Sequence, residues 1–272
     1  AGVVEAVGSG GDPSWIGREV VINPGLRWGP NPRVPGPEFE ILGMPRHGTY
    51  AEWIVVPIAN LAAKPPSLTW EQAAAVPLAG LTAYRAVVTR AQTRPGEFVL
   101  VTGIGGGVAT FALLIARWIG PRVVVTSADP AKLERAGELG AIAGVNYQDA
   151  DWTRQVIAHC DGQGPHVVID SAGGETINHA VEAVRPGGRI VNFGATTGPV
   201  PNLEIRRLFW KQLDLLGTTM GNAAEFDAMI RLFDAAGLSP VVDQVFPLED
   251  AAAAHHRMDQ AGQFGKIVLA IS

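Results

Sequence analysis

A run of glycines between a strand pattern and a helix pattern is the feature of this sequence best suited to bind a ligand. The residues from Phe98 to Thr102 are mostly apolar, and residues 103–108 follow as Gly-Ile-Gly-Gly-Gly-Val. Glycines let the main chain approach a phosphate closely, and the free amides of the following helix offset its negative charge. In this context we predict that Gly106, Gly107 and Val108 bind the pyrophosphate of a dinucleotide.

Strand and helix patterns alternate beyond this turn. Continuously apolar runs predict strands at residues 98–102, 123–127, 144–147, 166–170, 189–193 and 213–219. Helical spacing predicts helices between them at residues 108–119, 130–139, 152–160, 175–184 and 203–210. Strands without polar alternation are expected where helices cover both faces of a sheet. The order therefore predicts an α/β Rossmann fold, a doubly wound parallel sheet, over residues 80–237.

The two ends of the chain have a different pattern. Residues 1–66 contain short β-branched runs, such as Trp53 to Val56, which glycines and prolines interrupt. Residues 241–272 indicate a strand, a helix and a strand, so we expect residues 1–79 and 238–272 to form a smaller β-rich lobe. The chain begins with Ala1 inside an apolar stretch, which suggests a truncated or processed start.

Several segments resemble the medium-chain dehydrogenase/reductase superfamily. They are Ala-Gly-Val-Val-Glu-Ala-Val-Gly at 1–8, Gly-Thr-Tyr-Ala-Glu at 48–52, Leu-Ala-Gly-Leu-Thr-Ala-Tyr at 78–84, Asp-Ser-Ala-Gly-Gly at 170–174, Arg-Pro-Gly-Gly-Arg at 185–189 and Phe-Gly-Lys-Ile-Val at 264–268. The turn departs from the pattern of many members, which have Gly-Gly-Val-Gly where this chain has Gly-Gly-Gly-Val-Ala. The usual opening segment is also absent. The resemblance implies a barrel-like (GroES-like) lobe, here N-terminally truncated, beside the Rossmann domain.

The residues at the family's metal positions argue against zinc. Leu78 stands where zinc alcohol dehydrogenases of the superfamily have a metal-binding cysteine, and residues 25–43 lack the four cysteines of their structural site. Cys160 is the only cysteine, and the six histidines show no metal-ligand spacing. The chain therefore resembles the zinc-independent, quinone oxidoreductase-like branch. That branch transfers a nicotinamide hydride to a quinone or to the β-carbon of an α,β-unsaturated carbonyl.

The end of the second strand bears on the choice of cofactor. An acidic side chain there would bind the ribose of NAD and repel a 2′-phosphate, but the resemblance aligns Ser127 with that position. Lys132, and Tyr147 by its likeness to NADPH-using relatives, are further candidates for the phosphate, so we predict NADPH. Two alternatives remain: Ser127 caps the helix that begins at Pro130 while Lys132 is solvated, or Asp129 turns toward the ribose.

The resemblance implies further cofactor contacts at Thr82, Phe193, Gly194 and Lys266. Thr82 can equally bond within its helix, and Phe193 can equally belong to the core. No catalytic acid stands out from the sequence. Tyr50 is the only tyrosine of the first lobe and a candidate proton donor, although its setting is more typical of a structural strand.

Composition limits the partners. The 21 Lys and Arg against 26 Asp and Glu give a net charge of −5, which offers no general attraction for nucleic acid or an acidic membrane. No apolar run is long enough to span a membrane, and a single cysteine suits a reducing compartment. We therefore expect a cytoplasmic protein that acts on a small-molecule substrate. An NADPH-binding protein of this fold without turnover, and an NAD-dependent alcohol dehydrogenase, are the alternatives.

The strand predicted at residues 213–219 suggests an oligomer. In a doubly wound sheet of this order it lies at an edge, where its amides and carbonyls lack partners. It is apolar, contains no proline, and has Asp214 as its only charge. By resemblance, relatives pair there, so we predict a homodimer through this strand. The alternative is a monomer in which the helix expected near Ala224 covers the edge.

Overall fold

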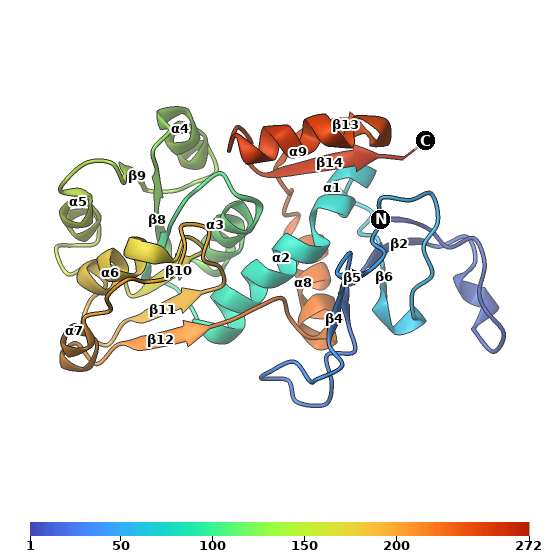
Figure 1. Ribbon diagram of the computed structural model, residues 1–272, viewed down its shortest axis with the longest axis horizontal. Helices are drawn as coiled ribbons and strands as arrows, with labels where there is room; N and C mark the ends of the chain where they lie inside the picture. Colours follow the sequence, from blue (N-terminus) through green and yellow to red (C-terminus); the bar gives the residue numbers. More distant parts are fainter. Residues whose placement is uncertain (272) are drawn as a thin grey trace. The chain divides into compact units, whose positions relative to one another are not determined.

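The computed structural model describes residues 1–271 and divides into two units (Figure 1). One unit contains Ala1–Leu81 together with the chain from Met220 onward, and the other contains Thr82–Thr219. The boundary between them falls within α2 (Pro77–Tyr84), which continues into a π-helix at Arg85–Arg90. Within the described residues, no helix has the length and apolarity needed to cross a membrane.

The second unit is built on a six-stranded parallel sheet in the order β12-β11-β10-β7-β8-β9. Its strands are β7 (Phe98–Val101), β8 (Arg122–Ser127), β9 (Ala143–Asn146), β10 (Val167–Asp170), β11 (Arg189–Asn192) and β12 (Asp214–Gly217). Helices lie on both sides of it (Figure 1), at α3 (Gly107–Ile119), α4 (Pro130–Glu138), α5 (Trp152–His159), α6 (Gly174–Ala183) and α7 (Ile205–Trp210). The predicted Rossmann class is confirmed, with small shifts at the element ends.

Charged side chains lie at the amino end of this sheet, and a buried thiol lies in the apolar cluster beside it. Arg189 donates to both carboxylate oxygens of Glu97 at 2.7 Å, and the guanidinium of Arg122 lies 3.6 Å from the ring centroid of Phe98. Cys160 is fully buried in the apolar cluster between sheet and helices. Burial raises the pKa of the Cys160 thiol to about 11.

The first unit consists of short strands and further helices. One antiparallel sheet joins β1 (Gly2–Val3), β2 (Glu19–Ile22) and β6 (Leu61–Ala63), and a second sheet joins β3 (Gly25–Leu26), β4 (Glu40–Leu42) and β5 (Pro45–Arg46). The parallel pair β13 (Val242–Pro247) and β14 (Lys266–Ala270) packs with α9 (Ala251–Asp259). A capping box of Thr69 and Gln72 begins α1 (Trp70–Ala75).

Two expectations for this unit differ from the structure. No strand forms at residues 53–56, where Val55 is 98% exposed, because no described segment pairs with this stretch. The helix α8 (Ala223–Ala236) groups with this unit, although the sequence placed it in the Rossmann domain. A Cβ built at Gly221 would lie 2.6 Å from Cδ1 of Leu81, and Asn222 donates to the carbonyl of Pro32 at 3.3 Å. These contacts hold the start of α8 within the first unit.

Candidate functional site

The glycine-rich turn joins the end of β7 to the start of α3, as predicted. Gly106 is the N-cap of the 13-residue helix α3, and no side chain caps its first amides. A Cβ built at Gly103 or Gly106 would meet no heavy atom within 4 Å, so the space beside these two residues is open. Open space at these two glycines, amides without a side-chain cap and the positive end of a helix dipole together fit the pyrophosphate of a dinucleotide.

Neighbouring strands hold the turn from both sides. On the β8 side, the amide of Gly103 donates to the Thr126 hydroxyl at 3.2 Å, and the amide of Ile104 donates to the Thr126 carbonyl at 2.8 Å. On the β10 side, the Thr102 hydroxyl donates to Asp170 at 2.6 Å. These bonds fix the main chain of the turn before any ligand binds.

The side chain of Lys132 lies over the turn. A Cβ built at Gly105 would be 2.8 Å from Cδ and 3.2 Å from Nζ of Lys132. The cation of α4 is therefore placed beside the glycines that could hold phosphate groups.

The end of β8 answers one question that the sequence left open. Asp129, not Ser127, caps α4: its carboxylate accepts from the amide of Ala131 at 2.9 Å. The buried Ser127 hydroxyl accepts from the amide of Asp129 at 3.1 Å. The side chain of Tyr147 is half-exposed, and its amide donates to the Ser127 carbonyl at 3.4 Å. The structure thus brings Ser127, Lys132 and Tyr147 to the same end of the sheet.

Phe193 and Gly194 follow β11 and belong to a pair of interlocked loops. The amide of Thr197 donates to the carbonyl of Ala172 at 2.9 Å. A Cβ at Gly194 would lie 2.8 Å from the carbonyl oxygen of Ser171. The loops that leave β10 and β11 consequently form one surface beside the glycine-rich turn. Thr82 is buried within α2.

Three further residues of interest lie in the first unit. The Tyr50 side chain is 61% exposed, lies in a bend rather than a strand, and places its hydroxyl 3.2 Å from Nε2 of His255. Leu78 is half-exposed on α2. Lys266 begins β14, and burial lowers the pKa of its ammonium group. Lys266 is half-buried, and no residue among 1–271 forms a side-chain hydrogen bond or ion pair with its ammonium, which makes it a partly desolvated cation suited to an anion.

Comparison with known proteins supplies the family. A zinc-type alcohol dehydrogenase-like protein, YogA, of Leptosphaeria maculans is 34% identical over 94% of this chain and 75% of its own length. The chain belongs to the medium-chain dehydrogenase/reductase superfamily. The family described as zinc-binding dehydrogenase matches residues 107–235. A quinone oxidoreductase of Pseudomonas aeruginosa is 31% identical over 82% of this chain and 71% of its own length. A crystal structure of an NAD-dependent alcohol dehydrogenase is 42% identical, covers all of this chain and 81% of its own, and superposes with a TM-score of 0.94.

The members of this superfamily are oxidoreductases. Those members that use zinc need a cluster of metal ligands. Within the part of the chain that the structure describes, no three His, Cys, Asp or Glu side chains are placed to hold a metal ion.

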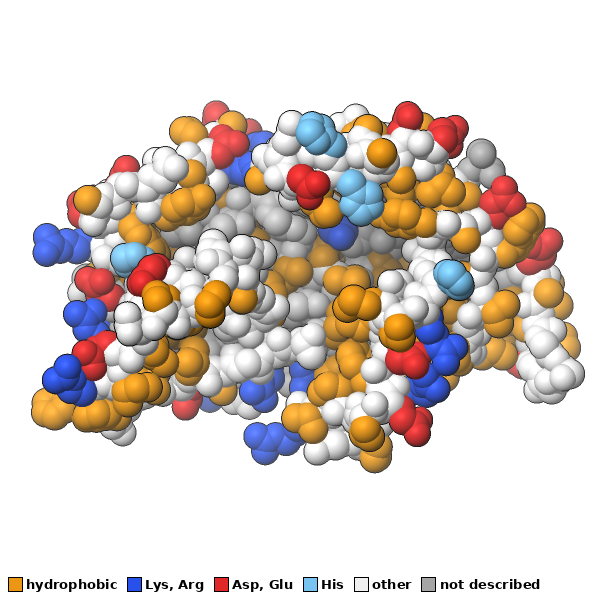
Figure 2. Space-filling model, in the orientation of Figure 1, with side chains coloured by type: hydrophobic (Ala, Val, Ile, Leu, Met, Phe, Trp, Pro, Cys, Tyr) orange, Lys and Arg blue, Asp and Glu red, His pale blue; other side chains and the backbone are white. Residues whose placement is uncertain are grey.

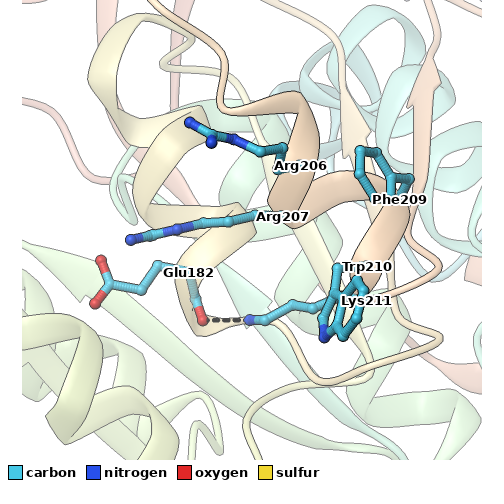
Figure 3. Close-up of a pocket in the computed structure, with 6 residues that line it drawn as sticks. All are labelled: Glu182, Arg206, Arg207, Phe209, Trp210 and Lys211. Carbon is cyan, nitrogen blue, oxygen red and sulfur yellow. Dashed lines mark hydrogen bonds between the residues drawn. The ribbon is translucent and has the colours of Figure 1, made fainter.

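One apolar pocket of this chain lies away from the glycine-rich turn. It has a volume of about 600 Å³ and lies between α6 and α7 (Figure 3), lined by Glu182, Arg206, Arg207, Phe209, Trp210 and Lys211. The amide of Gly187, just before β11, donates to the Lys211 carbonyl at 2.7 Å. The pocket therefore opens at the amino end of the parallel strands, whereas dinucleotides bind at the carboxyl end. Hydrophobic side chains are exposed on the surface over α7 (Figure 2).

Replacing Lys266 with methionine is expected to stabilise the free protein. A partly desolvated ammonium without a partner disfavours folding, and methionine keeps the apolar stem without the charge. We expect the free energy of unfolding at pH 7 to rise by about 1 kcal/mol, measured by denaturant titration. Because the folded-state pKa is lowered, wild type gains stability as pH rises through that value toward the unfolded value. The advantage of the variant should therefore shrink at alkaline pH.

Lys211 provides the matched control. Burial also lowers its pKa, but its Nζ donates to the carbonyls of Val181, Glu182 and Val184 at 3.0, 2.7 and 2.9 Å. Lys211→Met is expected to destabilise the protein, because it leaves these carbonyls at the end of α6 without a donor. A destabilised Lys266→Met variant would contradict the assignment of Lys266 as an unpaired cation.

Proposed function

We propose that this chain is an NADPH-dependent reductase that transfers hydride to a quinone or to the β-carbon of an α,β-unsaturated carbonyl, without zinc. Its superfamily supports an oxidoreductase, and the relative named quinone oxidoreductase supports this branch. The preference for NADPH rests on one observation. The ammonium of Lys132 lies over the turn, while the carboxylate of Asp129, which could oppose a phosphate, is bound to a helix amide. A small substrate and a cytoplasmic location belong to the same proposal.

The residues proposed to hold the cofactor include separate groups for its pyrophosphate and its 2′-phosphate. They are Thr82, Gly106, Gly107, Val108, Ser127, Lys132, Tyr147, Phe193, Gly194 and Lys266. The glycines and the first amides of α3 hold the pyrophosphate, and Ser127, Lys132 and Tyr147 hold the 2′-phosphate. Lys266 is a second cation available to phosphate. When bound, the cofactor supplies the hydride.

Proton supply is assigned to Tyr50 within this proposal. Reduction of an enone leaves an enolate that must gain a proton. The Tyr50 hydroxyl lies within hydrogen-bonding distance of His255, which can return a proton to it. Tyr50→Phe would then lower kcat more than it raises KM.

An NAD-dependent alcohol dehydrogenase is the second candidate. The observation that favours it is the structural neighbour of that name, at 42% identity. The positions of Leu78 and Lys132 argue against it, since the first offers no metal ligand and the second suits a 2′-phosphate.

Initial rates measured with both cofactors distinguish three possibilities: an NADPH-dependent reductase, an NAD-dependent alcohol dehydrogenase and a binding protein without turnover. We expect NADPH to be oxidised in the presence of a quinone or a small enone, more slowly with NADH, and at the same rate after treatment with a chelator. Oxidation of a simple alcohol with NAD, lost on chelation and restored by zinc, would refute the proposal. NADPH binding without turnover of any substrate would favour the binding protein.

A further inference from the structure

The carboxylate of Asp170 is a buried charge that the proposed function does not use. Asp170 is the last residue of β10 and is completely buried. It accepts from the Thr102 hydroxyl at 2.6 Å, the Gly173 amide at 2.9 Å and the Asn192 side-chain amide at 2.9 Å. Three accepted bonds are the pattern of an ionised carboxylate. Among residues 1–271, no lysine, arginine or histidine pairs with it.

A buried carboxylate without a cation is unusual, because buried charges are normally paired. Here neutral donors hold the charge in place but do not cancel it. In surroundings of low dielectric its field extends farther than it would in water. A cation that binds nearby would consequently be stabilised.

Asp170 also lies where the strand order reverses. In the sheet, β7 lies between β8 and β10. The chain goes from β7 to β8 and β9 on one side of β7, and then crosses to β10 on the other side. In doubly wound sheets a dinucleotide lies across the carboxyl ends of the strands at this point. Ser127 and Tyr147 mark the β8–β9 half for the adenosine ribose, which leaves the half formed by β10 and β11 for the nicotinamide.

We infer that Asp170 favours the oxidised form of the bound cofactor over the reduced form. Loss of hydride leaves the nicotinamide ring with one positive charge, whereas the reduced ring is neutral. The negative charge of Asp170 therefore stabilises the oxidised form selectively and makes the bound reduced cofactor a stronger hydride donor. This inference rests on the proposed function, since it requires that the chain binds a nicotinamide cofactor.

The test is the ratio of two dissociation constants, for NADP⁺ and for NADPH, in wild type and in Asp170→Asn. The asparagine keeps the shape and the network, because its oxygen can accept from Gly173 and Asn192 while its amide donates to Thr102, whose hydroxyl can reverse. Calorimetry for NADP⁺ and fluorescence for NADPH give the constants. We expect Asp170→Asn to weaken NADP⁺ binding more than NADPH binding by on the order of tenfold.

Thr126→Val is the matched control, because it removes the hydroxyl that holds the turn on the opposite side without changing any charge. We expect it to weaken both forms by the same factor. An unchanged ratio in folded Asp170→Asn, or an equal shift of the ratio in Thr126→Val, would overturn the inference while leaving the proposed function intact. Wild type that binds neither form would instead refute the proposed function, and the inference with it.

Thr102→Val covers the case in which Asp170→Asn does not fold. It keeps the carboxylate and removes one of its three donors, so the charge is less compensated. The ratio should then move a few-fold toward tighter NADP⁺ binding. A ratio equal to that of wild type in folded Thr102→Val would overturn the inference.

Discussion

Lys132→Met is expected to weaken NADPH binding by about 10- to 100-fold, because the contact proposed for this lysine is a charged hydrogen bond to the 2′-phosphate. NADH has no 2′-phosphate, so its affinity should change little. Methionine keeps the apolar stem that lies over Gly105, which preserves packing above the turn. Fluorescence titration of both reduced cofactors measures the two dissociation constants.

Two variants control this experiment. Lys132→Arg keeps the positive charge and should recover most of the NADPH affinity. Arg154→Met removes one positive charge from an exposed position on α5 and should affect neither cofactor. Equal losses for NADH and NADPH in Lys132→Met would show that the lysine does not recognise the 2′-phosphate.

Leu215→Lys is expected to convert a homodimer into monomers. We propose that two copies pair through β12, which is an edge strand with exposed or half-buried residues. Leu215 is 40% exposed there, and Trp210, on α7 just before the strand, is 84% exposed. In a dimer with twofold symmetry, each new lysine would lie opposite or close to the equivalent lysine of the second subunit. The two positive charges would then repel each other at the strand edge. Light scattering gives the mass of each species.

Ile142→Lys is the matched control for this interface. Ile142 is also a large exposed apolar residue, but it precedes β9 at the other edge of the sheet. The same charge placed there should leave the dimer unchanged. Wild type that is already monomeric, or a dimer that tolerates Leu215→Lys, would count against pairing through β12.

The Rossmann unit was predictable because its signals are local. Each strand is a short, continuously apolar run that ends in turn residues, and each helix has its own apolar spacing. The first unit depends on pairing between distant segments: β2 pairs with β6 about forty residues later. A β-branched run such as Trp53 to Val56 has the composition of a strand but finds no partner. The place of α8 depends likewise on contacts at Gly221 and Asn222 that leave no sequence pattern.

The site shows the same division. The glycine-rich turn is contiguous in the sequence, and Lys132 follows it within one crossover, so the sequence alone was enough to name both as candidates. The network of Thr102, Asp170 and Asn192 joins the ends of three strands, and it becomes visible only once the register of β7, β10 and β11 is known. One signal was present in the sequence: an aspartate ends an apolar strand directly before a loop of small residues. A charged residue is rarely buried at such a position unless its side chain makes specific interactions.

The burial of Cys160 has a practical consequence for spectroscopy on this protein. A thiol that is inaccessible and protonated well above neutral pH reacts slowly with maleimides and with oxidants. Since it is the only cysteine in the sequence, the wild-type chain should be labelled very little by thiol-reactive probes. A cysteine introduced at an exposed position of each unit would carry a donor and an acceptor dye, and the distance between the units could then be followed as cofactor is added.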